Sequence, residues 1–61
     1  MLLKFKVYED LKGGFRWNLS SNNGRIMADS GEAYVDKNNA KEAINTIVQH
    51  IQTGAFDIEA E

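Results

Sequence analysis

The first half of the chain alternates apolar and polar residues with the two-residue period of half-buried β-strands. Residues 3–8, 15–20 and 25–30 each show this alternation. Gly13-Gly14 follows the first run and Asn22-Asn23-Gly24 follows the second, and both supply the backbone freedom that hairpin turns need. The pattern therefore predicts a three-stranded antiparallel meander.

The second half changes to the 3.6-residue period of an α-helix. Its apolar face comprises Ala40, Ala43, Ile44, Ile47, Val48 and Ile51. Asp36 is the expected N-cap, with Asn39 as the alternative, and Gly54 is placed to end the helix. Residues 56–61 then alternate apolar residues with acids, which predicts a short C-terminal strand. We therefore expect one α+β domain over residues 1–61, in the order β-β-β-α-β.

The predicted sheet is too wide for one helix to cover. Four strands span about 15–19 Å, whereas a helix with its side chains is only about 10 Å wide. The alternation places four large residues on the face that needs covering, Phe5, Trp17, Ile26 and Phe56. Burial of a large aromatic side chain contributes about 2–3 kcal/mol. We expect a homodimer whose second copy supplies another helix, with a strongly curved sheet around a single helix as the alternative.

Composition narrows the class of protein. The 61 residues include no cysteine and a single histidine, so neither disulfides nor a structural metal are expected to stabilise the fold. The net charge of −2 gives no general attraction for nucleic acid. Lys4 and Lys6 interrupt the apolar start before a signal sequence can form, and no run is long enough to span a membrane. We expect a cytoplasmic protein without a cofactor.

Few residues are candidates for catalysis. Ser30, Glu32 and Tyr34 share one face of an extended segment and could supply a nucleophile, a base and an acid. Nothing marks an oxyanion hole, so we favour a hydrogen-bonded corner between the third strand and the helix. Asp29, Glu32 and Asp36 could gather a cation, but they lack the spacing of a calcium loop.

The lone imidazole, His50, lies beside the apolar stripe of the predicted helix. No cysteine or second histidine completes a metal site with it. We favour a residue near the helix C-terminus, where positive charge is stabilised by the helix dipole. The chain is therefore not expected to be an enzyme.

The most suggestive set of residues lies on the polar face of the predicted sheet. Alternation brings to this face Lys4, Lys6, Tyr8, Arg16, Arg25 and Met27. Basic groups around an aromatic ring suit single-stranded nucleic acid, since charge binds phosphate and the ring stacks on a base. A solvated face whose charges discourage edge pairing is the simpler interpretation. A binding module with an unknown partner is thus favoured, with weak nucleic-acid binding as the alternative.

Several segments together resemble the YegP-like family. They are Phe5-x-x-Tyr8-x-Asp10, Gly13-x-Phe15-Arg16-Trp17-x-Leu19, Asn23-Gly24, Ala28-x-Ser30-x-Glu32-x-Tyr34 and Ala40-x-x-x-Ile44. The resemblance runs from about Leu3 to Val48. It implies a β-β-β-α-β unit and, for a chain with a single repeat, a homodimer with one shared sheet and exchanged C-terminal strands. The family has no known function, so the resemblance implies no chemistry.

Overall fold

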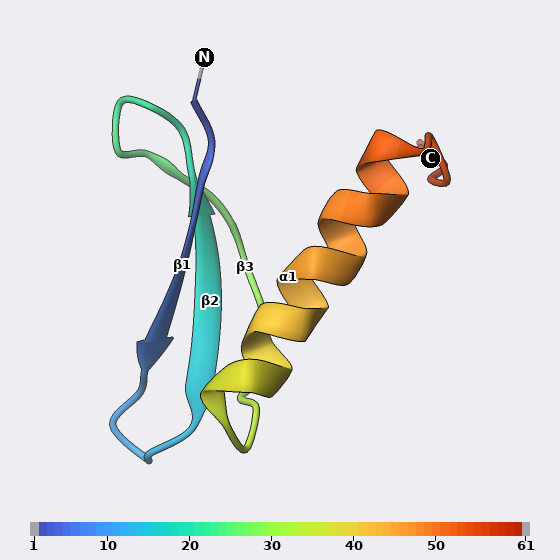
Figure 1. The fold of residues 1–61 in the computed structure, drawn as a ribbon. Coiled ribbons are helices and arrows are strands. Elements are labelled where there is room, and N and C mark those ends of the chain that lie inside the picture. The colour runs from blue at the N-terminus through green and yellow to red at the C-terminus, as the bar shows by residue number, and fades with distance from the viewer. Residues whose placement is uncertain (1, 61) are drawn as a thin grey trace.

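The computed structural model describes residues 2–60, which form a three-stranded sheet followed by one helix (Figure 1). The elements are β1 (Lys4–Glu9), β2 (Phe15–Ser20), β3 (Ile26–Asp29) and α1 (Lys37–Gln52). The strands pair antiparallel in the order β1-β2-β3. This arrangement confirms the predicted meander, the predicted helix and the α+β class.

Local chemistry explains where the elements end. Gly13 and Gly24 adopt φ values of 84° and 83° in the two hairpin turns, a region that residues with a Cβ rarely enter. The Asp36 carboxylate accepts a hydrogen bond from the backbone N–H of Asn39 at 2.8 Å, so Asp36 is the N-cap and the alternative cap is not used. Gly54, with φ 72°, follows the last turn of α1 as predicted.

The core lies between α1 and the first two strands, and it is small. Trp17 and Ala40 are the buried hydrophobic residues of the described chain, with 8% and 0% of their surface exposed. The ring of Phe5 meets the Trp17 ring edge-on, with 5.6 Å between their centroids. The helix contacts β1 and β2 and then diverges from the sheet (Figure 1). The prediction that Trp17 is buried is confirmed.

Ile26 does not join this core, and the prediction that it would is wrong. Leu19 pairs with Ala28, but the next residue, Ser20, pairs with Ile26, so Met27 is an extra residue in β3. Such a bulge shifts the alternation of side chains by one position. Ile26 consequently falls opposite a residue of the polar face, and 60% of its surface is exposed.

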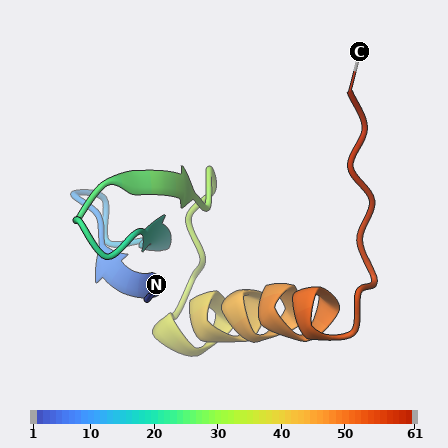
Figure 2. The ribbon, with the colours of Figure 1, turned by 90° about the horizontal axis from the view of Figure 1, so that it is seen from above.

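The C-terminal segment, residues 55–60, does not join its own sheet. It leaves the end of α1 and runs away from the strands, as Figure 2 shows. Phe56 and Ile58 are 60% and 82% exposed, so Phe56 is not part of the core of its own chain. The predicted fourth strand is absent from the described chain because α1 carries the segment beyond the sheet.

Candidate functional site

Four of the predicted polar-face residues share one side of the sheet. The cross-strand pairs are Lys4 with Ser20, Lys6 with Asn18, and Tyr8 with Arg16. Directly opposite residues of antiparallel strands project to the same side, so these pairs line a single face. Arg25 lies outside β3, in the turn before it, where its backbone N–H donates to the Asn23 side chain at 3.1 Å. The row of basic residues is therefore shorter than predicted.

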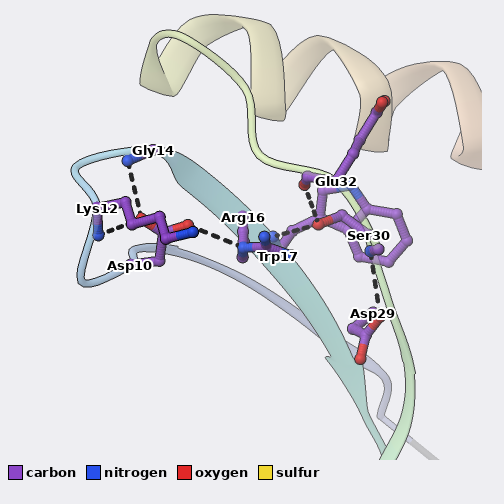
Figure 3. Close-up of polar contacts among 9 residues, drawn as sticks. Asp10, Lys12, Gly14, Arg16, Trp17, Asp29, Ser30 and Glu32 are labelled. Carbon is purple, nitrogen blue, oxygen red and sulfur yellow. Dashed lines mark hydrogen bonds and ion pairs between the residues drawn. The ribbon is translucent and has the colours of Figure 1, made fainter.

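One of the basic residues on this face is already paired. Arg16 Nε donates to Asp10 Oδ2 at 2.9 Å, and the other Asp10 oxygen accepts from the backbone N–H groups of Lys12 and Gly14, both at 2.9 Å (Figure 3). The hydrogen bond from Arg16 is the main reason that the pKa of Asp10 lies below its ordinary value. The same bond raises the pKa of Arg16. Asp10 thus organises the hairpin and neutralises part of the charge that nucleic acid would need.

A shallow hollow of about 400 Å³ opens beside this ion pair. The β1–β2 hairpin forms one wall, and the segment that leads into α1 forms the other. Its lining includes Asp10, Gly14, Arg16, Ala33, Tyr34 and Val35. The hollow was not predicted, although Asp10, three residues before Gly13-Gly14, is a turn signal that indicates the hairpin wall of the hollow.

Ser30 lies in a hydrogen-bonded corner between β3 and α1, of the kind that the favoured interpretation predicted. Ser30 Oγ donates to the backbone carbonyl of Glu32 at 2.8 Å and accepts from the backbone N–H of Trp17 at 3.4 Å (Figure 3). Tyr34 pairs through its backbone with Phe15, with N···O distances of 2.7 and 2.9 Å. Ser30, Glu32 and Tyr34 therefore all make hydrogen bonds that fix the segment between β3 and α1. The Ser30 hydroxyl is bonded to backbone groups.

Two of the three acidic residues considered for a cation make local contacts with the backbone. Asp29 accepts from the N–H of Gly31 at 3.1 Å, and Asp36 caps α1. His50 lies in the last turn of α1, where its Nδ1 contacts the carbonyl of Thr46 at 2.8 Å. Among residues 2–60, no cluster of three or more His, Cys, Asp or Glu side chains is arranged to hold a metal ion.

Trp17 carries an unsatisfied polar atom. Its indole Nε1 is buried and has no hydrogen-bond partner within the described part of the chain. Buried donors are nearly always paired in folded proteins. The indole N–H of Trp17 is therefore an exception among the buried polar groups of the described chain.

Together these features define a small β-β-β-α domain with a polar hairpin end and an unpaired C-terminal segment. None of the helices in the described range is long and apolar enough to cross a membrane.

Comparisons with known proteins identify the family. A domain of unknown function, DUF1508, matches residues 10–57. The chain is 40% identical over 43 residues to the UPF0339 protein NMB1088 of Neisseria meningitidis serogroup B, covering 70% of this chain and 75% of that protein. The UPF0339 protein NMA1193/NMA1859 of serogroup A matches to the same extent. The chain belongs to the DUF1508 family, which confirms its resemblance to the YegP-like family.

A solved structure agrees with this assignment. The NMR solution structure of a protein from Haloferax volcanii superposes with a TM-score of 0.77 and 40% sequence identity, over 95% of each chain. The fold is therefore shared across nearly the whole length of both proteins. The family is described as having no known function, and the comparisons support no specific activity.

Proposed function

We propose that this chain is a homodimeric interaction module in which two copies exchange their C-terminal segments within one shared sheet. The position of the C-terminal segment carries the proposal, because it extends away from its own strands (Figure 2). Its large apolar side chains, Phe56 and Ile58, alternate with acids and are 60% and 82% exposed. An apolar strand face of this kind is stabilised when another sheet covers it.

The thin core supports the same proposal. Trp17 and Ala40 are buried, but Leu3, Ile26 and Ile51 expose 49%, 60% and 58% of their surfaces. Domains of this size are marginally stable because so much of the chain remains at the surface. A second copy would bury more of this exposed apolar surface.

The connection between helix and segment also favours exchange. The N–H of Thr53 bonds to the carbonyl of Gln49 at 3.0 Å, and that of Ala55 bonds to His50 at 2.8 Å, so α1 ends tightly. The six residues of the C-terminal segment span at most about 20 Å when extended. To pair with its own sheet, the segment would first have to cross from the far end of α1 back to the strands. Few of its six residues would then remain to form a paired strand.

We further propose that the module acts by binding and not by catalysis. The Ser30 hydroxyl, the most plausible nucleophile, is engaged by the backbone groups of Trp17 and Glu32. A cytoplasmic location is part of the proposal, since a chain without cysteine needs no oxidising compartment to fold.

Single-stranded nucleic-acid binding is the alternative function, and the register favours it by aligning Lys4, Lys6 and Tyr8 on one face. The pairing of Arg16 with Asp10 and the presence of Asp29 opposite Asn18 weaken it. Retention on heparin or single-stranded oligonucleotides that falls steeply with salt would support this alternative.

Sedimentation equilibrium at micromolar concentration tests the dimer, which should have twice the chain mass of 6.9 kDa. Deleting residues 55–61 should lower both dimer affinity and thermal stability. Phe56→Ser with Ile58→Ser is the matched control of full length, and it should weaken the dimer in the same direction. A monomeric full-length protein, or a deletion variant that dimerises as well as the parent, would contradict the proposal.

Isotope-filtered NMR on a mixed labelled and unlabelled dimer tests the exchange itself. Contacts from the Phe56 ring should reach the sheet of the other copy. Contacts confined to its own chain would leave a dimer without exchange.

A further inference from the structure

The hollow beside the β1–β2 turn combines a fixed guanidinium with apolar residues. We infer that it binds a carboxylate carried on a small apolar body, and that Arg16 holds the carboxylate. The inference goes beyond the proposed function and does not depend on it, because the lining residues lie between Asp10 and Val35.

The guanidinium of Arg16 is held in place before any ligand arrives. Its Nε donates to Asp10 Oδ2 at 2.9 Å (Figure 3). The Asp10 carboxylate is itself fixed, because its Oδ1 accepts from the backbone N–H groups of Lys12 and Gly14, both at 2.9 Å. An arginine whose orientation is already fixed loses less conformational entropy on binding. Asp10 is thus a positioning residue for Arg16.

The terminal nitrogens of Arg16 remain available to a ligand. Within residues 2–60, this side chain makes its hydrogen bond through Nε alone. The side chain is partly exposed and lines the hollow, so a ligand there reaches Nη1 and Nη2. Two parallel N–H···O bonds from one guanidinium to one carboxylate are a strong and geometrically specific contact.

The charge of the lining favours an anion with a single charge. Arg16 and Lys12 are positive and Asp10 is negative, so the lining carries one net positive charge although the whole chain carries −2. Glu9 lies close to the same turn, with its Oε2 3.8 Å from the position of a Cβ added at Gly13. A doubly charged phosphate would be repelled more strongly by both acids. A carboxylate therefore fits this lining better.

The rest of the hollow suits a small apolar body. Its volume of about 400 Å³ lies toward the lower end of the range for ligand pockets, about 300–1,000 Å³. Gly13, Gly14, Ala33 and Val35 line it without polar side chains. Val35 exposes 88% of its surface, so a ligand that packs on it removes apolar surface from water.

The two walls of the hollow are joined by backbone contacts. Phe15 and Tyr34 exchange two hydrogen bonds, with N···O distances of 2.9 and 2.7 Å. Gly14 has no side chain where Ala33 approaches it, which allows the walls to come this close. The hollow is therefore formed without a ligand, and a preformed site lowers the cost of binding.

An NMR titration of the isotope-labelled full-length chain with sodium phenylpropionate, at neutral pH and constant ionic strength, tests the inference. The largest shifts should fall on the backbone N–H groups of Gly13, Gly14 and Val35 and on the Nε–H of Arg16. They should saturate with a Kd of about 1–10 mM, as expected for a shallow site. Phenylpropionamide, which has the same body without the charge, should bind at least about tenfold more weakly. Equal binding of the amide, or tighter binding of inorganic phosphate at these groups, would overturn the inference.

Arg16→Gln should weaken the binding of phenylpropionate by about tenfold or more, because it removes the charged pair of donors. Arg25→Gln is the matched control, since it removes the same charge from the β2–β3 turn at the other end of β2. This control should bind phenylpropionate as the parent does. Equal weakening in the two variants would show that net charge governs binding, and the inference would fail.

Val35→Glu keeps the test decisive if Arg16→Gln disturbs the hairpin. The Val35 side chain is exposed, and its replacement leaves Asp10 and Arg16 unchanged. A second carboxylate on this wall repels the ligand, so binding should weaken by about tenfold. Val35→Gln has a side chain of the same size without the charge and should weaken binding clearly less. Parent-like binding of phenylpropionate by Val35→Glu would contradict the inference.

The carboxylate can belong to a free acid or to the C-terminus of a peptide, and a second pair of probes distinguishes these sources. N-acetylglycylphenylalanine carries the same phenyl group and a carboxylate at a peptide end, and its C-terminal amide is the control. If this peptide acid binds at least as tightly as phenylpropionate and its amide does not, the hollow takes peptide termini. If phenylpropionate alone binds, the hollow takes small free acids. Failure of both acids to shift the resonances of the hollow would overturn the inference and leave the proposed dimer standing.

Discussion

Asp10 and Arg16 lie on the two sides of the β1–β2 turn and are joined by an ion pair, with Arg16 Nε donating to Asp10 Oδ2 at 2.9 Å. The same carboxylate accepts from the backbone of Lys12 and Gly14, so one side chain fixes both the turn and the orientation of the guanidinium. The Asp10 side chain is 18% exposed and that of Arg16 is 36% exposed. This end of the sheet is therefore held by polar contacts.

The ion pair predicts a pH dependence of stability. The folded-state pKa of Asp10 lies below its ordinary value of 3.8, chiefly because Arg16 donates to the ionised carboxylate. Its contribution is therefore complete above about pH 4 and is lost as the pH falls through the lowered folded-state pKa. Asp10→Asn keeps an acceptor for Lys12 and Gly14 but removes the charge. Its melting temperature should be lower than the parent's at neutral pH and should change less between pH 5 and about pH 2.

Asp10→Ala is the comparison that separates the two roles of this side chain. It removes both the acceptor and the charge, so its melting temperature should fall below that of Asp10→Asn at every pH. Equal melting temperatures for the two variants would show that the backbone contacts contribute nothing measurable. An unchanged acid response in Asp10→Asn would show that other carboxylates dominate the acid transition.

Trp17 is the residue whose loss should be most damaging. Only 8% of its surface is exposed, and its ring packs against that of Phe5. Trp17→Ala should lower the free energy of unfolding by about 3–5 kcal/mol, as truncations of buried aromatics do. Denaturant titrations at a fixed protein concentration would measure this, since association contributes to apparent stability.

Trp17→Phe is the milder control. It keeps an aromatic ring in the core and removes the indole N–H that has no acceptor in the described chain. The variant should therefore lose clearly less stability than Trp17→Ala. The parent protein should emit blue-shifted, quencher-protected fluorescence, and emission typical of a fully hydrated indole would contradict the assignment of the two sheet faces.

Much of the fold could be predicted because the signals are local. Period-two alternation, Asn23-Gly24, the Asp36 cap and the 3.6-residue stripe each act over a few residues, and the structure follows all four. The predicted sheet face of Ile26 was wrong because a single extra residue in β3 reverses the alternation of side chains. No residue type in that segment indicates the bulge.

The candidate site was harder to predict than the fold. The polar face follows from alternation alone, but the pairing of Arg16 with Asp10 depends on a hairpin that brings together residues six apart. The hollow depends on a contact between the hairpin and residues 33–35, which are distant in sequence. The C-terminal segment was predicted as a strand from its own alternating pattern, yet residues 55–60 form no strand in the described chain. Alternation shows that a segment has an apolar side but does not show whether a strand edge lies within its reach.

The helix cap offers a local test of stability. The Asp36 side chain accepts from the backbone N–H of Asn39 at 2.8 Å and satisfies one of the first donors of α1. Asp36→Ala should lower the free energy of unfolding by about 0.5–2 kcal/mol. Asn39→Ala should have a much smaller effect, because the contact uses the backbone of Asn39 and not its side chain. If the two variants lose equal stability, the cap is not the source of the effect.

Gly14 sits where the hairpin touches the segment that leads into α1, and this contact leaves no room for a side chain. A Cβ at Gly14 would lie 2.7 Å from the Cβ of Ala33, closer than such atoms approach in folded proteins. Gly14 does not have a positive φ, so a side chain there is disfavoured by the steric contact and not by the backbone conformation. Gly14→Ala should lower the free energy of unfolding by about 1–3 kcal/mol, the usual cost of overpacking. Ala33→Gly removes the opposing atom, so the double variant should recover stability relative to Gly14→Ala, and a double-mutant cycle should give a clear coupling energy.

Gly24→Ala is the contrasting control, because nothing lies within 4 Å of its added Cβ and only its φ of 83° causes strain. Ala33→Gly should therefore give no recovery in the Gly24→Ala background, and a recovery there would contradict the steric explanation.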